Sequence, residues 1–213
     1  MVLLRPTREW PSISHTEIVR RARVLVIDDG EFAYMPLFKR DGYTIEQWAD
    51  VDDLGALETG EFDLILLDLI GVGHRESADQ GFGILRHIRT TAPAQIVVAY
   101  SNADLSLEYQ PFFRDADAVL AKTSDYVQFK RTVDQLLDKR FSLGFYLDRI
   151  SRELDAHSVE APKTLRKARV AILSGNSEPL RRYLARNVQD EVTVDRVIAL
   201  VGVAAQVAAV WTG

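Results

Sequence analysis

Between residues 21 and 140, short apolar runs alternate with longer segments in which apolar residues recur every three or four positions. Several of the runs are continuous and rich in Val, Ile and Leu, which is typical of parallel strands buried on both faces. We therefore predict five strands of one parallel sheet. They are RVLVID, YTIEQW, FDLILLDL, QIVVAY and DAVLAK, at 23–28, 43–48, 62–69, 95–100 and 117–122.

The segments that follow these runs have helical spacing, with Gly, Asp or Pro near their ends. Five repeats of strand and then helix predict an α/β domain with a doubly wound, flavodoxin-like, five-stranded parallel sheet. The predicted helices lie within 32–41, 51–60, 81–92, 104–115 and 124–140.

After Arg140 the strand pattern stops, and the chain reads as helices only. We predict helices within 141–157, 164–176, 177–189 and 192–211, with a break around 157–163. The predicted organisation is an N-terminal extension (1–20) with a short helix in HTEIVRRA, an α/β domain (21–140), and an α-helical C-terminal domain (141–213) for output or dimerisation.

Charge is uneven along the chain, although the total is only −5. Residues 21–140 carry 13 basic and 21 acidic side chains, whereas residues 141–213 carry 10 basic and 8 acidic ones. Neither part has the strongly basic stripe of a dedicated nucleic-acid binder. The absence of cysteine excludes disulfides, thiolate catalysis and cysteine-based zinc sites, and it fits a reducing compartment.

The most apolar segment is VIALVGVAAQVAAVW, at 197–211. Its 15 residues fall short of the roughly 20 that span a bilayer, so we expect a buried bundle or dimer helix and no membrane span. The first residues have no sustained apolar region before a cleavage site, which argues against a secretory signal. We expect a cytoplasmic protein.

Polar residues follow four of the predicted strands. Asp28 and Asp29 end the first, Asp68 the third, Ser101 the fourth and Lys122 the fifth. The carboxyl ends of parallel strands meet at one edge of the sheet, where ligands bind. Three carboxylates there favour Mg²⁺, and the lysine and serine are suited to the oxygens of a phosphoryl group.

The elements VLVIDD, DLILLDL, IVVAYSN and ADAVLAK, in this order, resemble the receiver domain of two-component response regulators. The resemblance covers about residues 21–140. It implies that Asp68 accepts a phosphoryl group, usually from the phosphohistidine of a histidine kinase or a phosphotransfer protein.

The resemblance also implies a set of supporting roles. Mg²⁺ would be held by Asp28, Asp29, Asp68 and the backbone carbonyl of Ile70. Ser101 would be the switch hydroxyl, and Lys122 would bond an oxygen of the phosphoryl group.

Several positions depart from the family pattern. The loop LIGVGHRESADQG after Asp68 is longer than usual, and Thr123 replaces the proline that usually follows the lysine. Val119 stands where the family has its switch aromatic, and Tyr100 is the candidate substitute.

These observations favour a phosphorylation-dependent signalling protein, with the helical tail as output or homodimerisation element. A DNA-binding regulator is the first alternative, although no recognition helix is evident. A degenerate receiver that only binds proteins is the second. Enzymatic turnover is not expected, because Ile70 stands where phosphatases of this kind have a second carboxylate as general acid.

Overall fold

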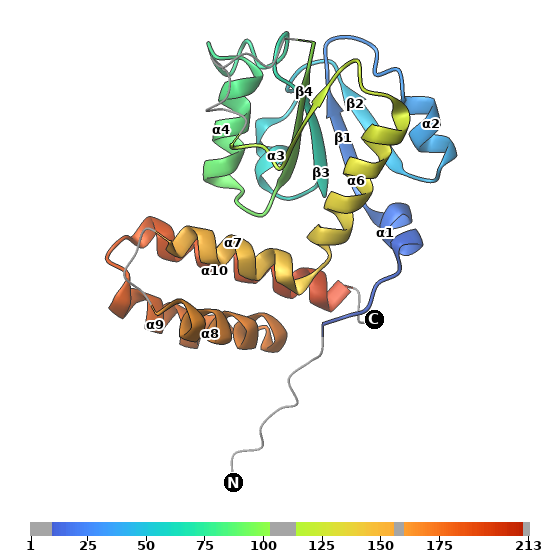
Figure 1. Ribbon diagram of the computed structural model, residues 1–213. Helices are drawn as coiled ribbons and strands as arrows, with labels where there is room; N and C mark the ends of the chain where they lie inside the picture. The colour runs from blue at the N-terminus through green and yellow to red at the C-terminus, as the bar shows by residue number, and fades with distance from the viewer. Residues whose placement is uncertain (1–9, 103–113, 156–159, 211–213) are drawn as a thin grey trace. The chain divides into compact units, whose positions relative to one another are not determined.

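The computed structural model describes residues 10–102, 114–155 and 160–210 (Figure 1). The chain forms two compact units. The α/β unit comprises residues 14–140, and the helical unit comprises the described residues 10–13 together with the chain from Phe141. The predicted N-terminal extension (1–20) is thus divided, because residues 14–20 belong to the α/β unit.

The α/β unit contains a five-stranded sheet in which every strand pairs in parallel with its neighbours. The strand order is β2-β1-β3-β4-β5, which is the flavodoxin-like doubly wound order. This confirms the predicted fold class and the five predicted strands. The strands are β1 (Arg23–Ile27), β2 (Thr44–Trp48), β3 (Leu64–Asp68), β4 (Ile96–Ser101) and β5 (Ala118–Ala121).

Helices cover both faces of this sheet, α3 and α4 on one side and α2 and α6 on the other (Figure 1). The helix predicted at 104–115 falls largely outside the described residues. The described helices of the unit are α1 (His15–Arg21), α2 (Met35–Arg40), α3 (Leu54–Glu58), α4 (Gly81–Thr91) and α6 (Tyr126–Arg140).

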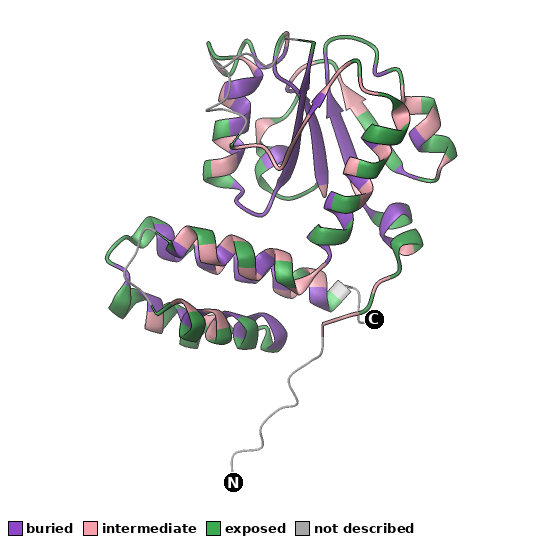
Figure 2. Cartoon of the chain, in the orientation of Figure 1, coloured by how far each residue is buried: buried purple, intermediate pink, exposed green. Residues whose placement is uncertain are grey.

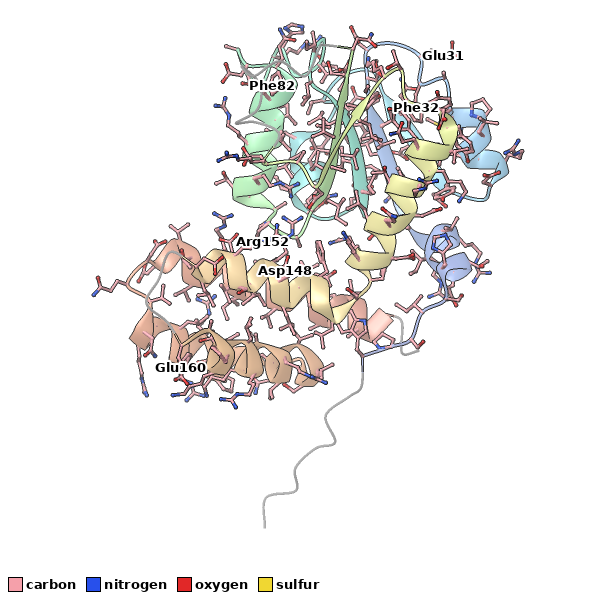
Figure 3. The ribbon with its side chains drawn as sticks, in the orientation of Figure 1. Glu31, Phe32, Phe82, Asp148, Arg152 and Glu160 are labelled. Carbon is pink, nitrogen blue, oxygen red and sulfur yellow. The ribbon has the colours of Figure 1, made fainter. Side chains whose placement is uncertain are left out.

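Side chains alternate between the two faces of the central strands β1, β3 and β4, which are buried apart from Arg23 at the start of β1 (Figure 2). Leu25 and Ile27 belong to the core beneath α3 and α4. On the opposite face, the ring of Tyr100 lies 6.0 Å from that of Phe32 and 5.8 Å from that of Phe129. Phe32 and Phe82, labelled in Figure 3, lie near the carboxyl ends of the strands on opposite sides of the sheet.

The predicted short helix before β1 is present as α1. The side chain of Ser14 caps it by accepting a hydrogen bond from the N–H of Glu17. The helix packs on α6, where His15 Nδ1 lies 2.8 Å from Asp138 Oδ1. This confirms a short helix packed on the α/β unit.

The described part of the helical unit contains four helices, and each contributes buried apolar residues, whereas Val170 and Val192 are exposed (Figure 2). Ser142 caps α7 by accepting from the N–H of Phe145, so α7 is a separate helix and not a continuation of α6. Trp10 Nε1 donates to the carbonyl of Phe141, and the Trp10 ring lies 5.9 Å from that of Tyr146. The helices are α7 (Leu143–Leu154), α8 (Ala161–Ser174), α9 (Glu178–Asn187) and α10 (Glu191–Val210).

Helix α10 begins six residues before the apolar run that the sequence analysis measured. Its 20 residues make Glu191–Ala209 the one segment of the described chain long and apolar enough to cross a membrane. The 15-residue apolar run is thus part of a longer helix, and the expectation of no membrane span stays a prediction. The core helix of a bundle meets the same criterion, and α10 packs against α7, α8 and α9.

Candidate functional site

The predicted site residues gather at the carboxyl edge of the sheet. Asp68 is the last residue of β3, Asp28 directly follows β1, and Lys122 directly follows β5. Since the three strands run in parallel, their ends meet at one edge. The sequence separation of these residues thus gives no measure of their distance in the fold.

Lys122 joins two of the carboxylates. Its Nζ lies 2.6 Å from Asp68 Oδ2 and 3.0 Å from Asp28 Oδ1. Both carboxylate side chains are only 4% exposed, whereas that of Lys122 is 21% exposed. The lysine therefore neutralises part of a buried negative charge that would otherwise be costly to fold.

Burial and hydrogen bonding have opposite effects on the pKa values of Asp68 and Lys122. Burial raises the pKa of Asp68 above its usual range, against the hydrogen bonds of Lys122 and the Ile70 N–H, which lower it. For Lys122, burial lowers the pKa, but the hydrogen bonds to Asp68 and Asp28 outweigh it and the pKa is raised. The lysine accordingly stays charged beside a carboxylate whose proton affinity is increased.

Asp28 is held by two further hydrogen bonds. The N–H of Gly30 donates to Oδ1 at 2.9 Å, and the hydroxyl of Tyr100 donates to Oδ2 at 2.7 Å. Tyr100 is 2% exposed, and burial followed by the bond to Asp28 raises the pKa of its phenol far above the usual value. The phenol is therefore a permanent donor, and it fixes the orientation of Asp28.

The third carboxylate, Asp29, is exposed, and ligand atoms of Asp28, Asp29 and Asp68 all lie within 4.8 Å of one another. Three carboxylates and one lysine leave a formal charge of −2, which a divalent cation would balance. Carboxylate oxygens are the donors that Mg²⁺ prefers, with water completing its shell. The residues present therefore fit a magnesium ion.

The long loop after Asp68 is folded onto the sheet by specific bonds. Val72 is fully buried, the N–H of Gly73 donates to Asp50 Oδ1 at 2.5 Å, and the N–H of Gly71 donates to Gln80 Oε1 at 2.9 Å. Burial raises the pKa of Asp50, but the hydrogen bonds from the N–H groups of Gly73 and Val51 outweigh it, so the pKa is lowered.

Two glycines of this region allow close packing. A Cβ atom on Gly71, whose φ is +97°, would lie 2.6 Å from Asp29 Oδ2. A Cβ atom on Gly81, the first residue of α4, would lie 2.3 Å from the carbonyl oxygen of Asp68. The start of α4 therefore packs directly on the end of β3, behind the predicted acceptor.

The remaining predicted site residues, Ile70 and Ser101, lie near the ends of β3 and β4. The Ile70 N–H donates to Asp68 Oδ1 at 3.2 Å, while the ligand role of its carbonyl stays a prediction. Ser101 is buried at the end of β4, and its carbonyl accepts from the N–H of Lys122 at 3.0 Å. The switch roles of the Ser101 hydroxyl and of the Tyr100 ring stay predictions.

The sequence analysis missed two contacts of the site. The bond from Tyr100 to Asp28 was not foreseen, although a tyrosine at the end of a buried strand usually finds a polar partner. The role of Asp50 was also missed, because it lies in the loop after β2 and binds a loop that follows β3.

No family model matches the sequence, and no curated protein matches it either. Solved structures similar to this chain include a response regulator receiver domain protein from Methanospirillum hungatei, at 23% identity and a TM-score of 0.46 over 56% of this chain and 95% of that one. Another is the response regulator TrrA from Thermotoga maritima in complex with Mg²⁺-BeF, at 21% identity and a TM-score of 0.44 over 54% and 98%.

A two-component response regulator from Clostridium difficile is also similar, at 18% identity and a TM-score of 0.48 over 57% of this chain and 100% of that one. The strand order of the α/β unit, β2-β1-β3-β4-β5, agrees with the fold that the resemblance implies. These matches cover little more than half of this chain.

Proposed function

We propose that this protein is a response regulator that is phosphorylated on Asp68 in the presence of Mg²⁺ and switches protein–protein interactions. The observation that supports the proposal best is the placement of Asp68. Its carboxylate lies among two further carboxylates and is paired with Lys122 at 2.6 Å. A buried carboxylate with a fixed cation and acidic neighbours has the parts required of a phosphoryl acceptor.

In the proposed reaction, an oxygen of the Asp68 carboxylate attacks the phosphorus of a phosphohistidine on a histidine kinase or phosphotransfer protein. The new O–P bond forms as the N–P bond breaks, and the electron pair of that bond stays on the departing imidazole. Lys122, whose Nζ already pairs with Asp68 Oδ2, is placed to bond an oxygen of the arriving phosphoryl group. Asp28, Asp29 and Asp68 would hold Mg²⁺, which supplies charge neutralisation for the transferring group.

The signal would then pass through β4 and β5. Ser101 ends β4, and the backbone N–H of Lys122 bonds its carbonyl, so the two residues are linked before any phosphoryl group arrives. Movement of the Ser101 hydroxyl toward the acyl phosphate would shift the end of β4 between two states. The helical unit, alone or paired with a second copy, is the proposed output element.

We expect no turnover of a separate substrate, because Ile70 offers no acid or base two residues after Asp68. We also expect the protein to act in the cytoplasm, where histidine kinases present their phosphohistidine. Both expectations rest on the proposed acceptor role of Asp68.

The test is intact-mass analysis after incubation with a small phosphodonor, with and without Mg²⁺. We expect one phosphoryl addition that requires Mg²⁺, is absent in Asp68→Asn and is retained in Asp52→Asn, a control that changes an exposed aspartate outside the cluster. Addition that persists in Asp68→Asn would refute the acceptor assignment. No addition to folded protein that binds Mg²⁺ would identify a receiver that works without phosphorylation.

A further inference from the structure

The helical unit has a groove between α8 and α9, with a volume of about 530 Å³. Its apolar lining, which we call the floor, consists of Val170 and Ala171 from α8 with Pro179 and Leu180 from α9, and Ser174 and Asn176 also line the groove. Val170 is 54% exposed, so the floor presents apolar surface to solvent. We call this feature the α8–α9 groove.

The rim of the α8–α9 groove is cationic. It is lined by Lys163 and, one turn later along α8, by the adjacent residues Arg166 and Lys167. Lys163 Nζ lies 3.5 Å from Oε2 of Glu160, which is labelled in Figure 3. Arg166 and Lys167, in contrast, have no carboxylate within ion-pair distance among the described residues. The ammonium groups of Lys163 and Lys167 also lie 5.7 and 5.0 Å from the centroid of the Tyr183 ring.

This rim belongs to a wider concentration of positive charge. Residues 160–187, which contain α8 and α9, carry seven basic and two acidic side chains, a formal charge of +5. The whole tail from residue 141 has a charge of only +2, because the acidic residues gather in the segments of α7 and α10. The average over the tail therefore conceals one strongly cationic helix pair.

We propose that the α8–α9 groove binds an acidic amphipathic helix of a partner protein. The apolar side chains of that helix would occupy the floor, and its carboxylates would meet Arg166 and Lys167 on the rim. Recognition of this kind combines apolar anchors at helical spacing with complementary charge. This binding would involve the helical unit alone and does not depend on phosphorylation of Asp68.

The groove suits a peptide better than a nucleic acid. The apolar side chains of the floor offer neither positive charge nor hydrogen-bond donors to a phosphate backbone, which would be bound by the rim cations alone. Single-stranded nucleic acids also need open aromatic rings for base stacking. Here the Tyr183 ring is already faced by two lysines.

The test uses the full chain and a labelled synthetic helix with Leu at positions i, i+3, i+4 and i+7 and Glu on its flanks, measured by fluorescence anisotropy. We expect saturable binding that Val170→Glu and Lys167→Glu each weaken about tenfold or more, as truncations of anchor contacts do. Arg169→Glu is the matched control, because it makes the same charge change on an exposed residue of α8 that does not line the groove. It should alter the affinity by less than about twofold.

Three results would overturn the proposal. The first is no binding, or equal binding of a peptide with Ser in place of each Leu. The second is an equal loss in Arg169→Glu and Lys167→Glu, which would indicate general charge attraction. The third is tighter binding of duplex DNA than of the peptide, which would make α8 and α9 a nucleic-acid surface. Circular dichroism checks that each variant is folded, and Arg166→Glu replaces Lys167→Glu if that variant is not.

Discussion

The hydroxyl of Tyr100, on β4, donates a hydrogen bond of 2.7 Å to Oδ2 of Asp28, which follows β1, although β3 lies between the two strands. Lys122 and the Gly30 N–H share the other oxygen of Asp28. A carboxylate has about four acceptor sites, so three are engaged and one remains for a metal ion. Asp28 is thus oriented by the protein before any cation arrives.

We therefore predict that Tyr100→Phe weakens Mg²⁺ binding by about tenfold, because partners that orient a metal ligand typically contribute 10- to 100-fold to affinity. Isothermal titration calorimetry would measure it. Tyr34→Phe is the control, since its hydroxyl bonds the carbonyl of Ser124 and not the carboxylates. Tighter Mg²⁺ binding in Tyr100→Phe would mean that the phenol competes with the cation instead of positioning its ligand.

The raised pKa of Asp68 has a consequence for stability. A carboxyl group whose pKa is higher in the folded state than its ordinary value of 3.8 favours folding at low pH, and this contribution is lost as the pH rises through the folded pKa. At pH 7 without Mg²⁺, we expect Asp68→Asn to raise Tm by roughly 2–4 °C, equivalent to about 1 kcal/mol for a chain of this size.

The difference in Tm between Asp68→Asn and the unmodified protein should shrink as the pH is lowered toward 4. Differential scanning calorimetry at a series of pH values measures it, with Asp52→Asn as the control. A lower Tm in Asp68→Asn at pH 7 would show that the pair with Lys122 outweighs the cost of burying the charge.

Gly81 should tolerate no larger residue. In Gly81→Ala the new Cβ atom would lie 2.3 Å from the Asp68 carbonyl oxygen and 2.8 Å from the Cα atom of Leu69, and backbone atoms of a buried strand end cannot move aside cheaply. We expect a loss of roughly 2–4 kcal/mol in the free energy of unfolding, measured by urea denaturation.

The same substitution at Gly202 should act in the opposite direction. Gly202 is exposed within α10, and a Cβ atom there would meet nothing within 4 Å. Alanine in a helix interior is favoured over glycine by about 0.5–1 kcal/mol, so Gly202→Ala should stabilise the protein. Destabilisation by Gly202→Ala would show that another surface packs closely on α10 at this residue in solution.

Asp50 should hold the loop that follows Asp68 in its folded position, because it accepts a hydrogen bond from the N–H of Gly73. Asp50→Ala removes the acceptor for the N–H groups of Gly73 and Val51, and leaving such groups unbonded costs about 1–3 kcal/mol. We expect faster proteolysis within residues 69–80, followed by mass spectrometry of the fragments. Asp52→Ala, in the same loop but exposed, should leave the cleavage rate unchanged.

The sequence predicts the five strands and their parallel sheet well, because both depend on patterns that are local in the chain. Continuous apolar runs such as LILL are typical of parallel strands buried on both faces, and the polar residue after each run indicates the functional edge. Asp28, Asp68 and Lys122 were brought together by this reasoning alone. In the structure, Lys122 is in contact with both carboxylates.

What the sequence does not predict are contacts set by the length and direction of individual side chains. Tyr100 reaches Asp28 only because a phenol spans the gap that a smaller side chain at that position would leave open. The α8–α9 groove was not predicted for a related reason. The sequence predicts both helices and shows the basic residues of the first, but which side chains line the space between the helices is set by their packing.

The bond from Trp10 to the carbonyl of Phe141 joins residues that are 131 positions apart in the chain. Together with the contact of Trp10 and Tyr146, it makes the entire α/β unit an insertion between the first described residues of the helical unit and the rest of it. During synthesis, Trp10 leaves the ribosome long before its partners exist, whereas residues 14–140 are complete as soon as α6 has emerged. Because contacts between distant residues form late, we expect vectorial folding in which the α/β unit folds first and Trp10 docks last.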